Sequence, residues 1–280
     1  MAVGKSCGAG GSWDAQVSEE EKALRDRMAK VSHKVLVLSG KGGVGKSTVA
    51  VNLAVALSMA GKSVGLLDVD IHGPSVPKML GLEGSRLVSE DESIVPIELG
   101  DMRVMSIGFL LQDPDQAVIW RGPKKIGAIR QFLGEVAWGK LDYLIVDCPP
   151  GTGDEPLTVA QYLKDADGAV IVTTPQEVAV VDVRKCVTFC RDVGMKVLGV
   201  VENMSGFACP KCGEVVNVFK SGGGEEMALQ MGIPFLGRAP LSAAVVESGD
   251  TGRPCVHHRK DDPAAKAFQA IADEMMKKMG

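Results

Sequence analysis

The 280-residue chain carries 31 Lys and Arg against 35 Asp and Glu, for a formal net charge of −4 at pH 7. This acidic balance argues against a bulk attraction to nucleic acid or to an anionic membrane, and no stretch approaches the roughly 20 uninterrupted apolar residues of a membrane span. Hydrophobic residues make up 45% of the chain, enough for a sizeable core, and aromatics only 4%, so aliphatic side chains must fill that core.

The N-terminal residues 1–17 predict a flexible lead that lacks the apolar core of a secretory signal. We therefore expect a reducing, cytoplasmic location, where the seven cysteines are thiols or metal ligands rather than disulfides. Ser18 and Glu21 then have capping-box spacing and start a charged helix that runs to about residue 30.

Apolar β-type runs alternate with helical runs over the rest of the chain. Strands are predicted at 34–38, 63–68, 103–106, 143–147, 169–173, 196–201 and 235–236, and helices near 48–60, 121–137, 155–164, 178–192, 223–231 and 263–278. Several strands are apolar on both faces, which suits a parallel sheet covered by helices on both sides. We predict one α/β domain over residues 18–280, built on a single doubly wound, mostly parallel sheet.

The first of these strands leads into a glycine-rich loop and then a helix. The order strand, glycine loop, helix is the context in which such a loop binds phosphates, because its backbone N–H groups and the helix N-terminus face the phosphate oxygens. The predicted nucleotide-binding residues are Gly40, Lys41, Gly42, Gly43, Val44, Gly45, Lys46, Ser47 and Thr48. Lys46 adds a full positive charge and Ser47 offers a hydroxyl to Mg²⁺. The loop predicts a site for a nucleoside triphosphate.

Acidic residues end two of the predicted strands. Asp68 and Asp70 end the strand at 63–68, and alternation places both carboxylates on one face. A buried carboxylate pair needs a partner charge, which Mg²⁺ supplies. Asp147 ends the strand at 143–147 and leads into residues 148–154, an arrangement suited to ordering a metal beside a loop that senses the γ-phosphate.

Lys41 is the unusual element of the glycine loop, because Lys46 already supplies a cation for one nucleotide. Two interpretations compete: a solvated loop lysine, or a charge aimed at the phosphates of another subunit. Its spacing alone leaves both open.

Residues 40–48 resemble the deviant Walker A motif of the MinD, ParA and nitrogenase iron protein superfamily. Taken with residues 68–75, 147–154, 173–176, 202–206 and 209–212, the chain resembles the Mrp/ApbC branch, P-loop ATPases that carry iron–sulfur clusters. The match runs from about residue 33 to 260.

The resemblance implies a role for each matched position. Lys41 would reach the nucleotide of the second protomer in a face-to-face homodimer, and Lys46, Ser47 and Thr48 would hold phosphates and Mg²⁺. By the same resemblance, Asp70 would position or activate the attacking water, Asp147 would order the magnesium shell and Asn203 would read adenine.

Cys209 and Cys212 form the chain's CxxC pair, in a turn sequence that aims two thiolates at one point. A tetrahedral zinc or a four-iron cluster normally takes four protein ligands, and the chain has no second CxxC. The simplest completion is the same pair from a symmetry-related subunit. The resemblance implies a 4Fe–4S cluster that bridges the two subunits, while a structural zinc or an unmetallated redox thiol pair remain alternatives.

The leading hypothesis is a homodimeric ATPase that holds an iron–sulfur cluster at its subunit interface and passes it to apo-proteins, with slow, switch-like ATP hydrolysis. One alternative is an ATP-driven electron donor that resembles the nitrogenase iron protein. Another is a ParA- or MinD-like positioning ATPase, against which the acidic balance and the CxxC weigh. We expect no nucleic-acid or membrane partner.

Overall fold

The computed structural model describes residues 19–91, 93–111, 120–209, 211–212 and 214–280. The predicted lead at 1–17 lies outside these residues. An eight-stranded sheet forms the centre of the described chain. Its strands, in spatial order, are β12 (Phe235–Arg238), β9 (Val197–Glu202), β8 (Gly168–Thr173), β1 (Val31–Ser39), β7 (Leu141–Asp147), β2 (Val64–Asp68), β6 (Met102–Ser106) and β5 (Ile97–Leu99).

All neighbouring strands are parallel except β5, which runs antiparallel to β6 at the edge. The central strands are buried on both faces, as their continuous apolar runs predict: residues 35–38 of β1 and 144–146 of β7 have no exposed surface. The doubly wound, mostly parallel sheet is therefore confirmed.

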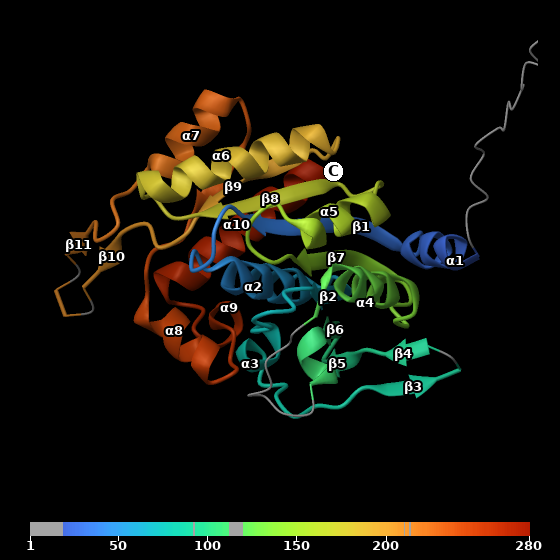
Figure 1. The fold of residues 1–280 in the computed structure, drawn as a ribbon. Helices are drawn as coiled ribbons and strands as arrows, with labels where there is room; N and C mark the ends of the chain where they lie inside the picture. Colours follow the sequence, from blue (N-terminus) through green and yellow to red (C-terminus); the bar gives the residue numbers. More distant parts are fainter. Residues whose placement is uncertain (1–18, 92, 112–119, 210, 213) are drawn as a thin grey trace, which may run out of the picture.

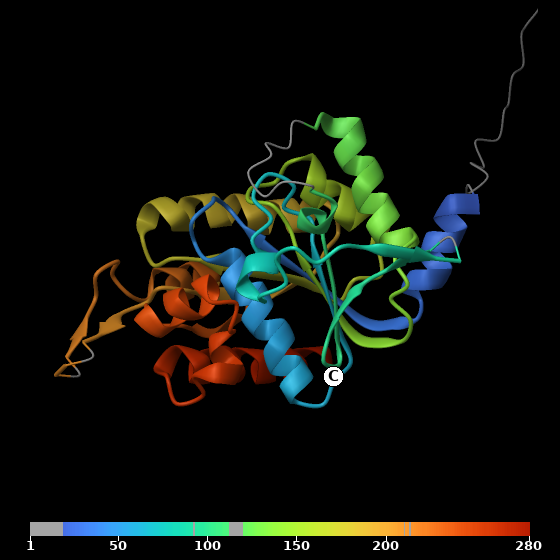
Figure 2. The same cartoon turned by 90° about the horizontal axis from the view of Figure 1, so that it is seen from below.

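Helices cover both faces of the sheet (Figures 1 and 2). On one face α2 (Lys46–Met59), α9 (Cys255–His258) and α10 (Pro263–Met279) pack on one another, and α3 (Val76–Met79) packs on α8 (Ala243–Asp250). On the other, α4 (Gly122–Gly134) packs on α5 (Asp154–Tyr162), and α6 (Glu177–Asp192) on α7 (Gly223–Met231). The first helix, α1 (Glu19–Met28), lies against α4.

Short elements lie outside the main layers. A hairpin of β3 (Val88–Glu90) and β4 (Ser93–Val95) and the 3₁₀ turn η1 (Ile107–Leu110) flank the β5–β6 edge. A second hairpin, β10 (Phe207–Ala208) with β11 (Val215–Val216), projects away from the body (Figure 1). In the described part of the chain, no helix is both long enough and apolar enough to cross a bilayer.

Trp138 is a core side chain that packs against β2 at Gly65. Its side chain is fully buried, its indole N–H donates to the carbonyl of Phe132 at 2.9 Å, and a Cβ added to Gly65 would come within 3.0 Å of its ring. The Trp138 ring therefore packs directly against Gly65, and a larger residue at position 65 would clash with it.

We expect Trp138→Ala to lower the free energy of unfolding by about 3–5 kcal/mol, because it opens a large cavity and removes the indole donor. Trp120→Ala is the control: that ring is partly exposed beside Lys124, and its loss should cost about 1 kcal/mol or less. Urea denaturation followed by circular dichroism measures both. Equal losses in the two variants would contradict the assigned core role.

Candidate functional site

The glycine loop joins the carboxyl end of β1 to the first turn of α2, as its sequence predicts. Gly45 has φ +79°, and the Asn203 side chain occupies the place where a Cβ would lie. Gly40 packs on α6, where a Cβ would come within 2.6 Å of the Asp182 carbonyl oxygen. Larger residues at these two positions would therefore displace the loop.

The loop borders a cavity of about 200 Å³. Asp70 contributes to its wall from beyond β2 and Pro150 from beyond β7, so three strand ends meet there. The lining residues are Ser39, Lys41, Gly42, Gly43, Gly45, Lys46, Ser47, Thr48, Asp70, Ser75, Met79 and Pro150. Most of the predicted nucleotide residues thus line one cavity. Val44 does not line it, because its side chain is buried in the core.

Lys46 and Asp147 form a buried ion pair next to this cavity. The ammonium lies 2.5 Å from Oδ1 of Asp147, with side chains 6% and 0% exposed. Burial by itself lowers the pKa of Lys46, but the carboxylates of Asp147, Asp68 and Asp70 together outweigh this and raise it overall. Lys41, half-buried in the same loop, has no ion-pair partner among the described residues. The two loop lysines therefore differ: one is neutralised, and the other remains available.

The Asp147 carboxylate contacts Lys46 through only one of its two oxygens, Oδ1. Its Oδ2 is buried and has no hydrogen-bond partner within the described chain. An unsatisfied buried carboxylate oxygen beside a phosphate-binding loop is suited to Mg²⁺ or a water of its shell. Ser47, which lines the cavity and whose Oγ is 3.2 Å from the Lys46 ammonium, supplies the hydroxyl that such an ion also needs. These residues fit a magnesium ion.

Asp68 and Asp70 have different environments. Asp68 is fully buried and pairs in register with Asp147, and burial and that carboxylate raise its pKa to about 8. It accepts hydrogen bonds from the Ser106 hydroxyl at 2.9 Å and the Asp70 backbone N–H at 3.0 Å. Asp70 is half-buried on the cavity wall, where burial raises its pKa against the opposing pull of Lys46. Only Asp70 is placed to meet a water in the cavity, so Asp68 acts as a support for the loop.

Lys125 of α4 connects the loop after β2 to the first turn of α5, which follows the loop after β7. Its ammonium donates to Nε2 of His72 at 2.7 Å and to Oε1 of Glu155 at 2.8 Å. Lys125 and Glu155 are 16% and 12% exposed, and the hydrogen bond helps to lower the pKa of Glu155 although burial opposes it. The sequence reasoning missed this lysine, because nothing in its local pattern distinguishes it from a solvated helix residue.

Asn203 contacts the phosphate loop itself. Its side-chain N–H donates to the carbonyl of Val44 at 2.9 Å, and its side chain is buried. The expected reading of adenine by Asn203 stays a prediction, since this contact occupies only the amide nitrogen.

Cys209 and Cys212 lie at the tip of the projecting hairpin, where Cys209 is half-buried and Cys212 is exposed. Hydrogen bonds from the backbone of Cys212 and Lys211 and from the Cys212 side chain lower the pKa of Cys209. Thiolate character and exposure are the properties that a metal-ligating pair requires. Among the residues that the structure describes, no group of three or more metal-ligating side chains lies together.

The other described cysteines are buried thiols. Burial raises the pKa of Cys186 to about 11 and of Cys190 and Cys255 to about 12, and also raises that of Cys148. Cys255 donates its S–H to Oδ1 of Asn52 at 3.2 Å. These residues behave as small core side chains. Cys7 lies outside the described residues.

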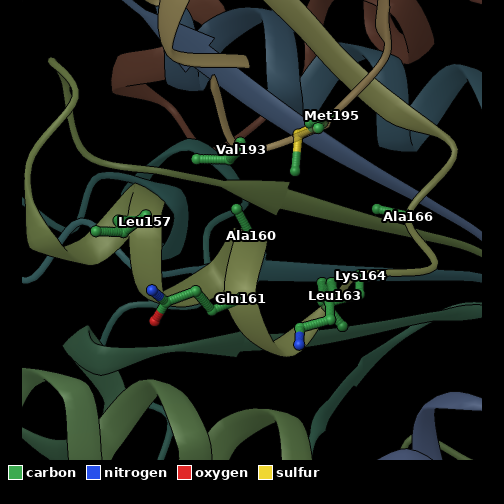
Figure 3. Close-up of a pocket in the computed structure, with 9 residues that line it drawn as sticks. Leu157, Ala160, Gln161, Leu163, Lys164, Ala166, Val193 and Met195 are labelled. Carbon is green, nitrogen blue, oxygen red and sulfur yellow. The ribbon is translucent and has the colours of Figure 1, made fainter. Parts of the chain in front are cut away.

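A larger hollow, of about 360 Å³, lies between the end of α5 and the loop before β9 (Figure 3). It opens at the amino ends of the strands, the edge opposite the phosphate loop. Among its nine lining residues only Gln161 and Lys164 carry polar side chains. It lacks the convergent polar groups of a catalytic site.

Comparison with known proteins agrees with this geometry. A sequence profile of the ParA family, described as the NUBPL iron-transfer P-loop NTPases, matches residues 30–276. The chain is 50% identical over 264 residues to an iron-sulfur cluster carrier protein of Methanocaldococcus jannaschii, covering 94% of this chain and 90% of that protein. It is 52% identical over 262 residues to the cytosolic Fe-S cluster assembly factor NUBP2 of Bos taurus, covering 92% and 97%.

Solved structures show the same fold. The nucleotide-binding protein of Archaeoglobus fulgidus, in complex with ADP, superposes with a TM-score of 0.77 at 42% identity, covering 90% of this chain and 96% of that one. The cell division ATPase MinD of Pyrococcus furiosus superposes with a TM-score of 0.63 at 22% identity, covering 88% and 99%, and supports the fold alone.

The contrast between the two loop lysines predicts different outcomes for their removal. Lys46→Ala should abolish ATP binding and also lower the stability of the nucleotide-free protein by on the order of 3 kcal/mol, because it leaves Asp147 buried without its partner. Lys41→Ala should leave that stability unchanged. Isothermal titration with ATP and urea denaturation without nucleotide measure the two effects. A Lys46→Ala protein as stable as the wild type would show that the buried pair contributes nothing to the fold.

Proposed function

This chain belongs to the NUBPL-type iron-transfer P-loop NTPases of the ParA family, and we propose that it is a cytosolic, ATP-dependent carrier of iron–sulfur clusters. Relatives that are 50–52% identical to this chain are named as an iron-sulfur cluster carrier and as cytosolic Fe-S cluster assembly factors. They align with more than nine-tenths of this chain. The proposed cargo is a 4Fe–4S cluster, and the proposed recipients are apo iron–sulfur proteins.

The exposed Cys209–Cys212 pair is the observation that carries this function. Two thiolates leave a four-iron cluster half ligated, and a second copy of the chain offers the same pair across a two-fold axis. A cluster held in this way belongs to neither protomer, so a small change in the arrangement of the two copies alters its exposure. That property suits a carrier, which must both hold and release its cargo.

ATP is the proposed nucleotide. Lys46 and Thr48 would hold its phosphates with the loop backbone, and Ser47 and Asp147 would face Mg²⁺, which supplies charge neutralisation for the phosphates when bound. In this state the Lys46 ammonium exchanges Asp147 for phosphate oxygens. Asp70 would position the attacking water at the cavity wall. Hydrolysis then serves as a slow switch rather than a synthetic reaction.

Nucleotide state is proposed to reach the rest of the protein through the loops after β2 and β7. Lys125 contacts the first of these loops at His72 and the start of α5, directly after the second loop, at Glu155, so a shift of one would be passed to the other. Lys41, whose ammonium has no ion partner in the described chain, is proposed to contact the triphosphate of the second copy.

Replacing either hairpin cysteine should separate cluster binding from nucleotide binding. Cys209→Ala and Cys212→Ala are expected to lose the bridging cluster while keeping the wild-type affinity for ATP, because the hairpin projects away from the phosphate loop (Figure 1). The matched control is Cys190→Ala, whose thiol is buried in α6. Iron, sulfide and zinc analysis after anaerobic purification measures the cluster. Stoichiometric zinc without sulfide in the wild type would refute the cluster assignment.

The cross-subunit role of Lys41 can be tested by mixing two inactive variants. Lys41→Ala should impair hydrolysis more than ATP binding, and Asp70→Asn should block hydrolysis. If Lys41 acts on the partner's nucleotide, a mixed dimer of the two contains one complete site, and an equal mixture should recover about a quarter of wild-type phosphate release. If Lys41 acts within its own subunit, the mixture stays inactive, and this result would contradict the proposed dimer.

A further inference from the structure

Glu202 is a buried acid that the proposed reaction does not use. It is the last residue of β9 and has no exposed surface. Its Oε1 accepts hydrogen bonds from the Ser205 hydroxyl at 2.6 Å and the Gly222 backbone N–H at 2.9 Å, and its Oε2 accepts from the Gly224 backbone N–H at 2.6 Å. The Arg238 guanidinium lies 4.0 Å away. Both oxygens of this carboxylate are therefore engaged as hydrogen-bond acceptors.

The donors to Glu202 lie on both sides of the projecting hairpin. We call residues 205–224, which carry Cys209 and Cys212, the cysteine loop. Ser205 lies at its start, and Gly222 and Gly224 lie at its end, so one carboxylate joins both ends of the loop to β9. The hydroxyls of Ser205 and Ser221 also meet at 2.9 Å.

The cysteine loop has only a few other attachments to the body of the protein. At its start the Ser205 N–H donates to the Ala239 carbonyl at 3.0 Å and the Leu241 N–H donates to the Gly206 carbonyl at 2.8 Å. Near its end Lys220 pairs with Glu177 at 2.8 Å.

The two strands of the hairpin have two residues each, and Val215, Val216 and Val218 are 65%, 48% and 56% exposed. So short a hairpin is not stable without its attachments. The position of the hairpin therefore depends on the attachments at the two ends of the loop, and Glu202 is the acceptor that both ends share.

The next residue of the chain holds the phosphate loop. Asn203 donates from its side chain to the Val44 carbonyl at 2.9 Å, and its backbone N–H donates to the Thr173 carbonyl at 2.8 Å. The phosphate loop and the cysteine loop are thus attached to consecutive residues at the end of one strand.

We infer that Glu202 is a positioning residue that couples the nucleotide site to the cysteine loop. A shift of the phosphate loop at Val44 moves Asn203, and Glu202 beside it transmits the shift to both ends of the cysteine loop. This inference rests on the proposed function in one respect, that nucleotide state governs the cluster, and it names the residues that make the connection.

Glu202→Gln tests the coupling with minimal change in volume. An amide has one acceptor oxygen, so its NH₂ group faces either the Gly224 N–H or the donors at Oε1, and at least one hydrogen bond is lost. Glu225→Gln is the control, since that residue lies nearby on α7, is exposed, and pairs with Arg238.

The measurement is hydrogen exchange of peptides that cover residues 205–224, on the cluster-free chain, with and without a non-hydrolysable ATP analogue and Mg²⁺. In the wild type and in Glu225→Gln, nucleotide should change the exchange rate of this segment. In Glu202→Gln the segment should exchange about tenfold faster and no longer respond to nucleotide, while the affinity for the analogue changes by less than about threefold.

A wild-type response in Glu202→Gln, or a wild-type chain whose cysteine loop ignores nucleotide, overturns the inference. If Glu202→Gln does not fold, Ser205→Ala replaces it: a reduced response supports the coupling and an undiminished one overturns it. Iron and sulfide content after anaerobic reconstitution tests the proposed carrier function separately, so the failure of one idea is distinguishable from the failure of the other.

Discussion

The functional edge of the sheet is organised around one buried ion pair, between Lys46 and Asp147. Taking two charges out of water is costly, and each is tolerated because the other lies beside it. β1 and β7 are neighbours, with Val37 opposite Asp147, so the glycine loop must turn back sharply to bring Lys46 over that carboxylate. In the proposed nucleotide-bound state, a triphosphate would offer Lys46 a more highly charged partner, and Asp147 would then be free to face a magnesium shell. Under this proposal nucleotide binding rearranges the ion pair rather than filling a rigid site.

Much of the fold could be predicted because its central strands are buried on both faces. Residues 35–38 and 143–146 are continuously apolar, a pattern typical of strands buried on both faces, and both segments form strands. The hairpins at 88–95 and 207–216 were not predicted: their strands have two or three residues and largely exposed side chains, so they show no periodicity. Helices α8 and α9 were also missed, since they are short and separated by Gly252 and Pro254.

The phosphate loop could be recognised because all its functional atoms lie within nine consecutive residues. The side chains that contact this loop and its neighbours come instead from segments far apart in the sequence. The pairing of Lys46 with Asp147 depends on the register of two strands about a hundred residues apart, and the Lys125 contacts join three separate segments. Glu202 had one local signal, an acid that ends an apolar strand directly before Asn203, but its hydrogen bonds depend on a loop that returns twenty residues later. Such contacts follow from tertiary structure and leave no spacing to read.

Two of the buried carboxylates at this edge, Asp147 and Glu202, differ in their hydrogen bonding. Asp147, on β7, keeps one oxygen unsatisfied, and so can take a new ligand when the nucleotide arrives. Glu202, on β9, has accepted hydrogen bonds on both oxygens, and so resists change and moves only with its strand. β1 and β8 separate these strands, and the phosphate loop spans the gap from Lys46 to the contact of Val44 with Asn203. The phosphate loop therefore lies between a carboxylate that can change its partner, Asp147, and a strand end that is rigidly held, at Glu202. This arrangement would let a movement of the phosphate loop displace the cysteine loop as a unit.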